Sequence, residues 1–325
     1  MKHPYLSQIS QISAADASAA QLAGLADQSL ELLIVSSSGE IEIMATAEAR
    51  AVVRAVLPHP AAPVVFVSVG CSGLYASVLE FIQSGAQKAR VLLLESPAAF
   101  VQSTLDHAGM GADGDGFVAQ DVSFCFTLSY QASPLAWQVQ YCAIFARPAS
   151  ISGTARLASK VLSQMANLLQ EQPDARLVTF ENCSEWSRRL AQLMTVLCPQ
   201  YALPPVAEWL PTVENKQHHY MTVRPLLDLA ALEPLARQQP IILSCLGAGG
   251  RFGVILLSTC EHLRSTHFAI PEAQPLTLEV PELVPDLKSA QEAEPRIVLY
   301  AQREYFGRDN FYFKWRLHRE HWQPA

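Results

Sequence analysis

The sequence has few charged residues, no basic block and no long apolar run, and each of these absences excludes a class of protein. Only 16% of the 325 residues are charged and 50% are hydrophobic, a composition that excludes a disordered chain. Asp and Glu (30) outnumber Lys and Arg (23), giving a net charge of −7, which argues against binding to nucleic acid or to an anionic membrane. The longest apolar runs, such as residues 64–69 and 254–257, have the length of strands and fall far short of the ~18 residues that a membrane span needs.

Paired cysteines are also missing. Seven cysteines are scattered along the chain, an odd number without a C-x-x-C pair, so neither a zinc ribbon nor a disulfide scaffold is indicated; they are Cys71, Cys125, Cys142, Cys183, Cys198, Cys245 and Cys260. Residues 1–14 are polar and lack the apolar core of a signal peptide. We therefore expect a cytoplasmic protein with reduced thiols, no metal and no resident cofactor.

Short β-branched runs alternate with helix-forming stretches, which is the pattern of an α/β fold. A first strand is hard to find in residues 1–29. The pattern predicts strands at 30–35, 64–69, 91–94, 122–128, 136–146, 176–180, 241–246 and 252–258, helices at 45–56, 74–83, 154–170, 185–197 and 225–237, and a terminal hairpin at 296–302 and 310–317.

The most informative segment is VVFVSVGCSGLYASVLEFIQSG, residues 64–85. A buried strand leads into a tight turn that contains Cys71, and a helix begins directly behind it. A thiol at a helix N-terminus feels the positive end of the helix dipole, which favours the thiolate. A buried cysteine is more often structural than reactive, but this context favours Cys71 as a nucleophile.

A second segment, IILSCLGAGGRFGVILLS at residues 241–258, joins two apolar runs through glycines. A dinucleotide-binding loop would need a helix after the glycines, whereas a strand-like run follows and Phe252 stands where the last glycine of G-x-G-x-x-G is expected. A glycine hairpin can instead offer a backbone N–H to an oxyanion. A turn that needs glycine only for its backbone angles fits the residues equally well.

Together these two segments resemble the thiolase fold and, within it, the ketoacyl synthase III branch. GCSGLYASVLEFIQSG followed by ARVLLLES is similar to that family's nucleophile turn and helix, and SCLGAGGRFGVILL is similar to its last two strands. The resemblance, which covers about residues 30–260, implies a five-layer αβαβα fold of two related halves, at 1–133 and 134–261, with a C-terminal extension at 262–325. It also implies that Cys71 accepts an acyl group from acyl-CoA or an acyl carrier protein, with an oxyanion site formed by backbone near Gly247 and Gly249.

Two departures from the family pattern stand beside this resemblance. The family's catalytic histidine would fall at Phe180, and its catalytic asparagine at about His218. His218 is therefore a candidate base for Cys71, with an exposed loop histidine as the alternative. Glu181 and Asn182, next to Phe180, are candidates for lining the site.

Two functions compete on these grounds. The first is an acyltransferase or ketosynthase-like enzyme of fatty-acid or polyketide-type biosynthesis. The second is a non-catalytic partner subunit of an active ketosynthase, similar to a chain-length factor. The resemblance further implies a homodimer or heterodimer formed through the strand at residues 64–69. A nucleotide-binding domain is a third alternative, which would require a helix after Gly250.

Overall fold

The computed structural model describes residues 3–12, 27, 29–37, 63–68, 71–93, 118–119, 123–133, 136–147, 152–180, 185–211, 218–219, 221–247, 251–259, 299–305 and 311–317. The strands are β1 (Tyr5–Ile12), β2 (Leu32–Ser37), β3 (Val64–Ser68), β4 (Lys88–Leu93), β5 (Val118–Ala119), β6 (Ser123–Ser129), β7 (Trp137–Ala146), β8 (Arg176–Leu177), β9 (His218–His219), β10 (Ile241–Gly247), β11 (Arg251–Thr259), β12 (Leu299–Tyr305) and β13 (Phe311–Leu317). The helices are α3 (Gly73–Ser84), α5 (Gly153–Glu171), α6 (Glu185–Leu197), α7 (Arg224–Ala231) and α8 (Glu233–Ala236), with 3-10 turns η2 (Cys198–Tyr201), η3 (Val206–Glu208) and η4 (Met221–Val223).

Within the described residues the strands form an 11-stranded sheet in the order β12-β13-β3-β2-β4-β6-β1-β7-β11-β10-β8, and β5 pairs with β9 separately. The order repeats between the halves. If the strands of the first half are numbered along the chain, they lie in the order 3-2-4-5-1, and only the fifth, β6, is antiparallel to its neighbours. In the second half β8-β10-β11-β7 repeats the order 2-4-5-1, again with the last strand in sequence, β11, antiparallel.

The described residues of the second half contain no strand equivalent to the third strand of the first half, and an isolated β-bridge lies at its position. Val178, next to β8, forms a parallel bridge with Leu210, on the side of β8 that faces away from β10. The two halves therefore share one topology, and they meet where β1 pairs antiparallel with β7.

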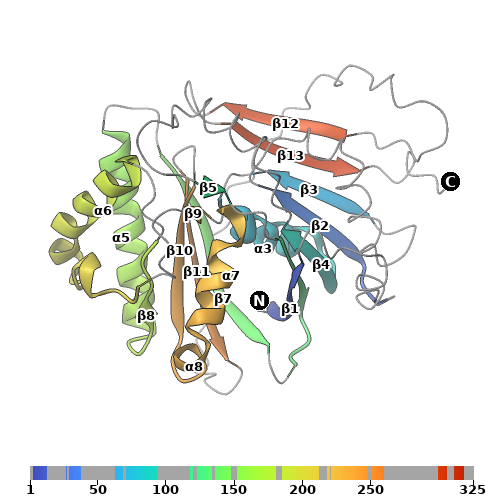
Figure 1. Ribbon diagram of the computed structural model, residues 1–325, viewed down its shortest axis with the longest axis horizontal. Helices are drawn as coiled ribbons and strands as arrows, with labels where there is room; N and C mark the ends of the chain where they lie inside the picture. The colour runs from blue at the N-terminus through green and yellow to red at the C-terminus, as the bar shows by residue number, and fades with distance from the viewer. Residues whose placement is uncertain are drawn as a thin grey trace.

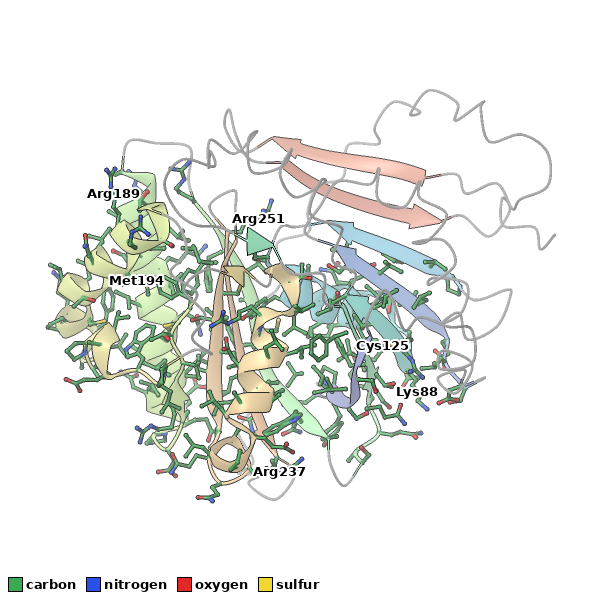
Figure 2. The ribbon with its side chains drawn as sticks, in the orientation of Figure 1. Lys88, Cys125, Arg189, Met194, Arg237 and Arg251 are labelled. Carbon is green, nitrogen blue, oxygen red and sulfur yellow. The ribbon has the colours of Figure 1, made fainter. Side chains whose placement is uncertain are left out.

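Helices cover the two half-sheets in layers (Figure 1). α5 and α6 lie on the outer face of the second half-sheet, and α3 and α7 lie between the two half-sheets. Each space is filled by its own apolar cluster: the inner cluster contains Leu74, Phe126 and Leu226, and the outer cluster contains Leu162 and Met194. Figure 2 shows the side chains around Met194 of α6, which is fully buried on the α5 side.

Most expected elements are confirmed, with shifts of one to three residues at their ends. The expected helix at 45–56 lies outside the described residues. The expectation that residues 1–29 lack a strand is wrong, because β1 lies there and pairs with both β6 and β7. Its sequence YLSQISQI reads as polar, yet it occupies the centre of the sheet with Leu6 fully buried, so tertiary position overrides its weak strand propensity.

Two other segments differ from the sequence-based expectation. The predicted helix at 225–237 divides into α7 and α8 at Leu232, because Pro234 lacks the N–H that would continue the helix. The predicted strand at 176–180 shortens to Arg176–Leu177. Among the described residues, no helix is both long and apolar enough to cross a membrane.

The C-terminal hairpin joins the first half-sheet. β12 and β13 form a regular antiparallel pair, and β13 pairs antiparallel with the outer edge of β3, where Arg316 lies opposite Val65 and Phe313 lies opposite Ser68. The resemblance implied that this edge of β3 meets a second chain. In the structure it is paired with a strand of its own chain.

Candidate active site

Cys71 lies between the end of β3 and the start of α3. Ser72 occupies the N-cap position of α3 without making a side-chain capping hydrogen bond, and the helix ends at Gly85 in the left-handed conformation. Parallel strands β2 and β3 run toward this turn, so Cys71 lies at the carboxyl edge of the sheet, where ligands bind in open α/β folds. The first N–H groups of α3 have no partner within the helix, which makes its N-terminus the positive end of the dipole.

The end of β10 lies beside this turn. The Cys245 thiol donates a hydrogen bond to the carbonyl oxygen of Cys71, with a sulfur–oxygen distance of 3.2 Å. Gly247 follows two residues later on the same strand, a separation of about 7 Å, and pairs with Arg251 at the start of the hairpin turn. Gly247 is thus on the strand whose Cys245 contacts Cys71, whereas Gly249 lies outside the described residues, and the oxyanion role of both glycines stays a prediction.

A buried thiol and a buried phenol lie where α3 packs against the second half-sheet. The Cys142 thiol donates to the carbonyl oxygen of Tyr75, at 3.6 Å, and burial raises the pKa of Cys142 well above its usual value. Burial also raises the pKa of Tyr75, and Cys245, Cys142 and Asp228 add to this shift. Both groups are therefore neutral at physiological pH.

The 3-10 turn η4, which leads into α7, packs against the N-terminus of α3. A Cβ atom added at Gly73 would lie 2.5 Å from Cγ2 of Thr222 and would also overlap Oγ of Ser36. Only a glycine allows this approach. Ser36, Ser72 and Thr222 are fully buried, so three hydroxyl-bearing residues surround the first turn of α3.

His218 lies four residues before Thr222. Its strand β9 pairs in parallel with β5, so that Val118 lies opposite His218. His218 thus lies in the chain segment that precedes η4 and α7. Its role as a base for Cys71 stays a prediction.

Phe180 and Cys71 occupy different apolar clusters. Phe180 is buried in the outer cluster and packs edge-on against Phe252, with ring centroids 5.1 Å apart, whereas Cys71 belongs to the inner cluster. Glu181 and Asn182 lie outside the described residues, and the pocket-lining role of all three stays a prediction.

Ser36, Thr222 and Cys245 also lie at the Cys71 turn, and none of them was predicted as a site residue. Ser36 had a recognisable signal, because it ends a buried strand and starts the run Ser36-Ser37-Ser38-Gly39, which is where a parallel sheet places ligand-binding residues. The contacts of Thr222 and Cys245 with the Cys71 turn join segments more than 140 residues apart, and no local pattern predicts them. Among the described residues, no group of three or more His, Cys, Asp or Glu side chains is arranged to hold a metal ion.

The comparisons with known proteins match this chain by structure and not by sequence. No protein-family model matches the sequence, and no curated protein matches it significantly. The solved structure of ChlB3, described as an acyltransferase, superposes with a TM-score of 0.55 at 13% identity, over 79% of this chain and 98% of that chain. A histidine-to-alanine variant of OleA from Xanthomonas campestris gives 0.52 at 11% identity, over 76% and 82%, and a glutamate-to-glutamine variant gives 0.51 at 13% identity, over 76% and 81%.

The chain has the thiolase fold. Two half-sheets of one topology enclose α3 and α7, with α5 and α6 outside the second half-sheet, as the resemblance implied. At these identities the likeness concerns the fold. The dinucleotide-binding alternative is excluded, because it requires a helix after Gly250 and the residues there form strand β11.

Proposed function

We propose that this thiolase-fold chain handles acyl thioesters, with Cys71 as the residue that accepts the acyl group. The observation that carries the proposal is the position of Cys71 at the N-terminus of α3, with its carbonyl held by the Cys245 thiol at the end of β10. The description of ChlB3 as an acyltransferase supports the same reaction class. The donor is acyl-CoA or an acyl carrier protein.

In the proposed step, the Cys71 thiolate attacks the carbonyl carbon of the donor thioester. The negative charge that develops on the carbonyl oxygen is stabilised by backbone N–H groups at the start of α3 and near Gly247. The bond from the carbonyl carbon to the carrier sulfur then breaks, the carrier leaves as a thiol after taking up a proton, and Cys71 holds the acyl group. His218 is the candidate that removes the proton from Cys71.

The test is intact-protein mass spectrometry after incubation with a panel of acyl-CoA and acyl carrier protein donors. We expect the mass of one acyl group to be added to the native chain and to be absent from Cys71→Ala. Cys142→Ala is the matched control, because Cys142 is a neighbouring buried thiol, and it should acylate normally. An adduct that persists in Cys71→Ala would contradict the assignment.

A second candidate function is a non-catalytic subunit that forms a heterodimer with an active ketosynthase. Phe180 favours it, because the resemblance aligns the family's catalytic histidine with this position in the sequence, and the apolar side chain found there packs against Phe252. Without that histidine, decarboxylative condensation lacks a group to assist it. Failure of every donor to acylate the native chain, together with raised activity of a ketosynthase on addition of this chain, would favour this candidate.

A further inference from the structure

Within the part of the chain that the structure describes, two buried hydroxyl groups next to Cys71 have no hydrogen-bond partner. They are Oγ of Ser36 and Oγ of Ser72, and both residues are 0% exposed. A buried hydroxyl without a partner lowers the stability of the folded state. The presence of two such hydroxyls at one turn therefore needs an explanation other than stability.

Both hydroxyls lie at the N-terminus of α3. Ser72 is the N-cap residue, yet its side chain makes no capping bond, although serine at this position ordinarily caps the helix. Ser36, at the carboxyl end of β2, is directed at Gly73, since its Oγ would overlap a Cβ atom there. Cys71 precedes Ser72 directly, so both hydroxyl-bearing residues border the turn that contains Cys71.

The contrast with Ser77 shows that hydroxyls on this helix can be satisfied. Ser77 is also fully buried on α3, and its Oγ donates to the carbonyl oxygen of Gly73 at 2.8 Å. Ser36 and Ser72 make no such bond to the backbone. Their donor and acceptor capacity remains available to a group bound at the Cys71 turn.

We propose that Ser36 and Ser72 bind a hydroxyl group of the acyl chain carried by Cys71, so that the chain selects hydroxyacyl over plain alkyl thioesters. This inference rests on the proposed function. The residues around the site, Ser36, Ser72, Gly73 and Thr222, are neutral, which suits a neutral hydroxyl, whereas a buried carboxylate requires a charged partner. A site whose buried polar groups pair with a substrate hydroxyl rejects the analogue that lacks it, because those groups then stay unpaired.

The test compares two donors of equal carbon number, butyryl-CoA and 3-hydroxybutyryl-CoA. Their binding to full-length Cys71→Ala is measured by calorimetry, so that no reaction is needed. We expect 3-hydroxybutyryl-CoA to bind at least about tenfold more tightly. Adding Ser36→Ala or Ser72→Ala to this chain should reduce the preference to less than about threefold, whereas Ser77→Ala, the matched control, should leave it unchanged.

Equal binding of the two donors, or no binding of either, would overturn the proposal. So would an unchanged preference in both serine variants, even if those variants were more stable, because the hydroxyls would then have a structural role only. The proposed function is tested separately on the native chain. Preference in binding without an adduct on Cys71 would refute acyl transfer alone, and an adduct without preference would refute hydroxyacyl selection alone.

Discussion

Arg224 and Asp228 form an ion pair inside α7, at the interface between the two halves. Nε of Arg224 donates to both carboxylate oxygens of Asp228, at 3.1 and 3.2 Å, and both side chains are almost fully buried. We expect Asp228→Asn to lower the free energy of unfolding by about 3 kcal/mol, since it leaves a buried guanidinium without its charged partner. Urea unfolding measures the change.

The control for this prediction is the exposed pair of the same spacing in α8. Arg237 and Glu233 are also four residues apart, but their side chains are 34% and 50% exposed. Glu233→Gln should therefore cost less than about 1 kcal/mol. Equal losses in the two variants would show that burial does not distinguish the pairs.

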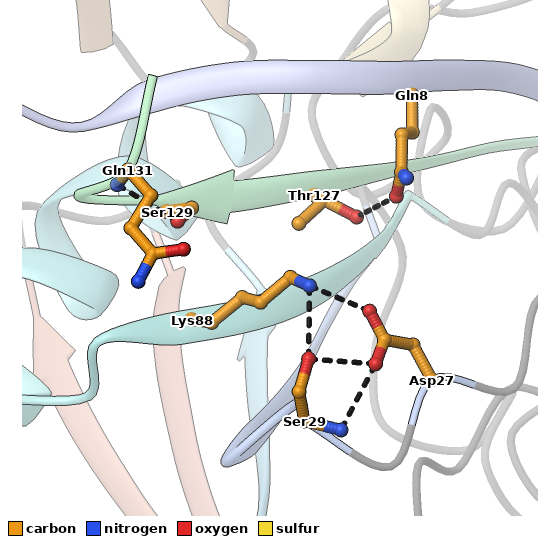
Figure 3. A network of polar contacts seen from close by, with 7 residues as sticks. All are labelled: Gln8, Asp27, Ser29, Lys88, Thr127, Ser129 and Gln131. Atoms are coloured by element: carbon orange, nitrogen blue, oxygen red, sulfur yellow. Dashed lines mark hydrogen bonds and ion pairs between the residues drawn. The ribbon is translucent and has the colours of Figure 1, made fainter. Parts of the chain in front are cut away.

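Asp27 is a residue whose ionisation links stability to pH. Nζ of Lys88 donates to its carboxylate at 2.6 Å, and Ser29 donates to it through both its backbone N–H and its hydroxyl (Figure 3). The hydrogen bond from Lys88, with those from Ser29, lowers the pKa of Asp27 well below its usual value of 3.8. The stabilisation is therefore present above about pH 4 and is lost as the pH falls through the lower pKa of the folded state.

Asp27→Asn should remove this pH-dependent contribution. We expect the variant to lose less than about 1 kcal/mol at pH 7, because the pair is partly exposed to solvent. Its stability should also fall less steeply than that of the native chain between pH 4 and pH 2. A pH series of thermal unfolding curves tests this, and parallel curves for the two proteins would be the contrary result.

At the scale of elements, helix α3 packs against the second half-sheet through an aromatic ring that lies directly over a glycine. A Cβ atom added at Gly253 on β11 would lie 2.5–2.7 Å from the ring of Tyr75. Gly253→Ala should thus force Tyr75 and α3 away from β11. We expect a loss of about 1–3 kcal/mol in unfolding free energy, as for other overpacked cores.

Tyr75→Phe is the matched variant for this contact. It keeps the ring and removes a buried hydroxyl that has no hydrogen-bond partner among the described residues, so it should leave stability unchanged or raise it slightly. If Gly253→Ala were as stable as the native chain, the ring would not be held in place by this contact.

At the scale of the whole molecule, the C-terminal hairpin replaces an apolar sheet edge with a polar one. β3 is a run of β-branched and aromatic residues, VVFVS, whose open edge would invite pairing with another chain. β13 covers that edge, and the new outer strand, β12, contains Gln302, Arg303 and Glu304 at its centre. A dimer through the edge of β3 would therefore need β13 to leave it.

Cysteines introduced across this pairing test it in the full-length chain. Val65→Cys with Arg316→Cys should form a disulfide within one chain, because directly opposite residues have Cα atoms about 5 Å apart. The control is Val65→Cys with Tyr300→Cys, in the same row but one strand farther, at about 10 Å. Non-reducing electrophoresis separates the outcomes. Cross-linked dimers as the main product would mean that β13 pairs with the β3 of another copy.

Local pattern was sufficient to predict most of the elements and the position of Cys71. The β-branched runs of β3, β10 and β11 and the apolar periodicity of α5 and α6 carry their secondary structure in their own residues. Cys71 was predictable because its signal, a strand, a tight turn and a helix, is contiguous in the sequence.

Tertiary structure decided the features whose parts are distant in the chain. β1 has too polar a sequence to be recognised, and it is a strand because β6 and β7 supply hydrogen-bond partners on both sides. Thr222 and Cys245 reach the Cys71 turn only because the second half packs η4 and β10 against the start of α3. The physical reason is the range of the forces: propensity and periodicity act within a few residues, whereas contacts between hydroxyls, thiols and helix ends exist only once the halves have closed on each other.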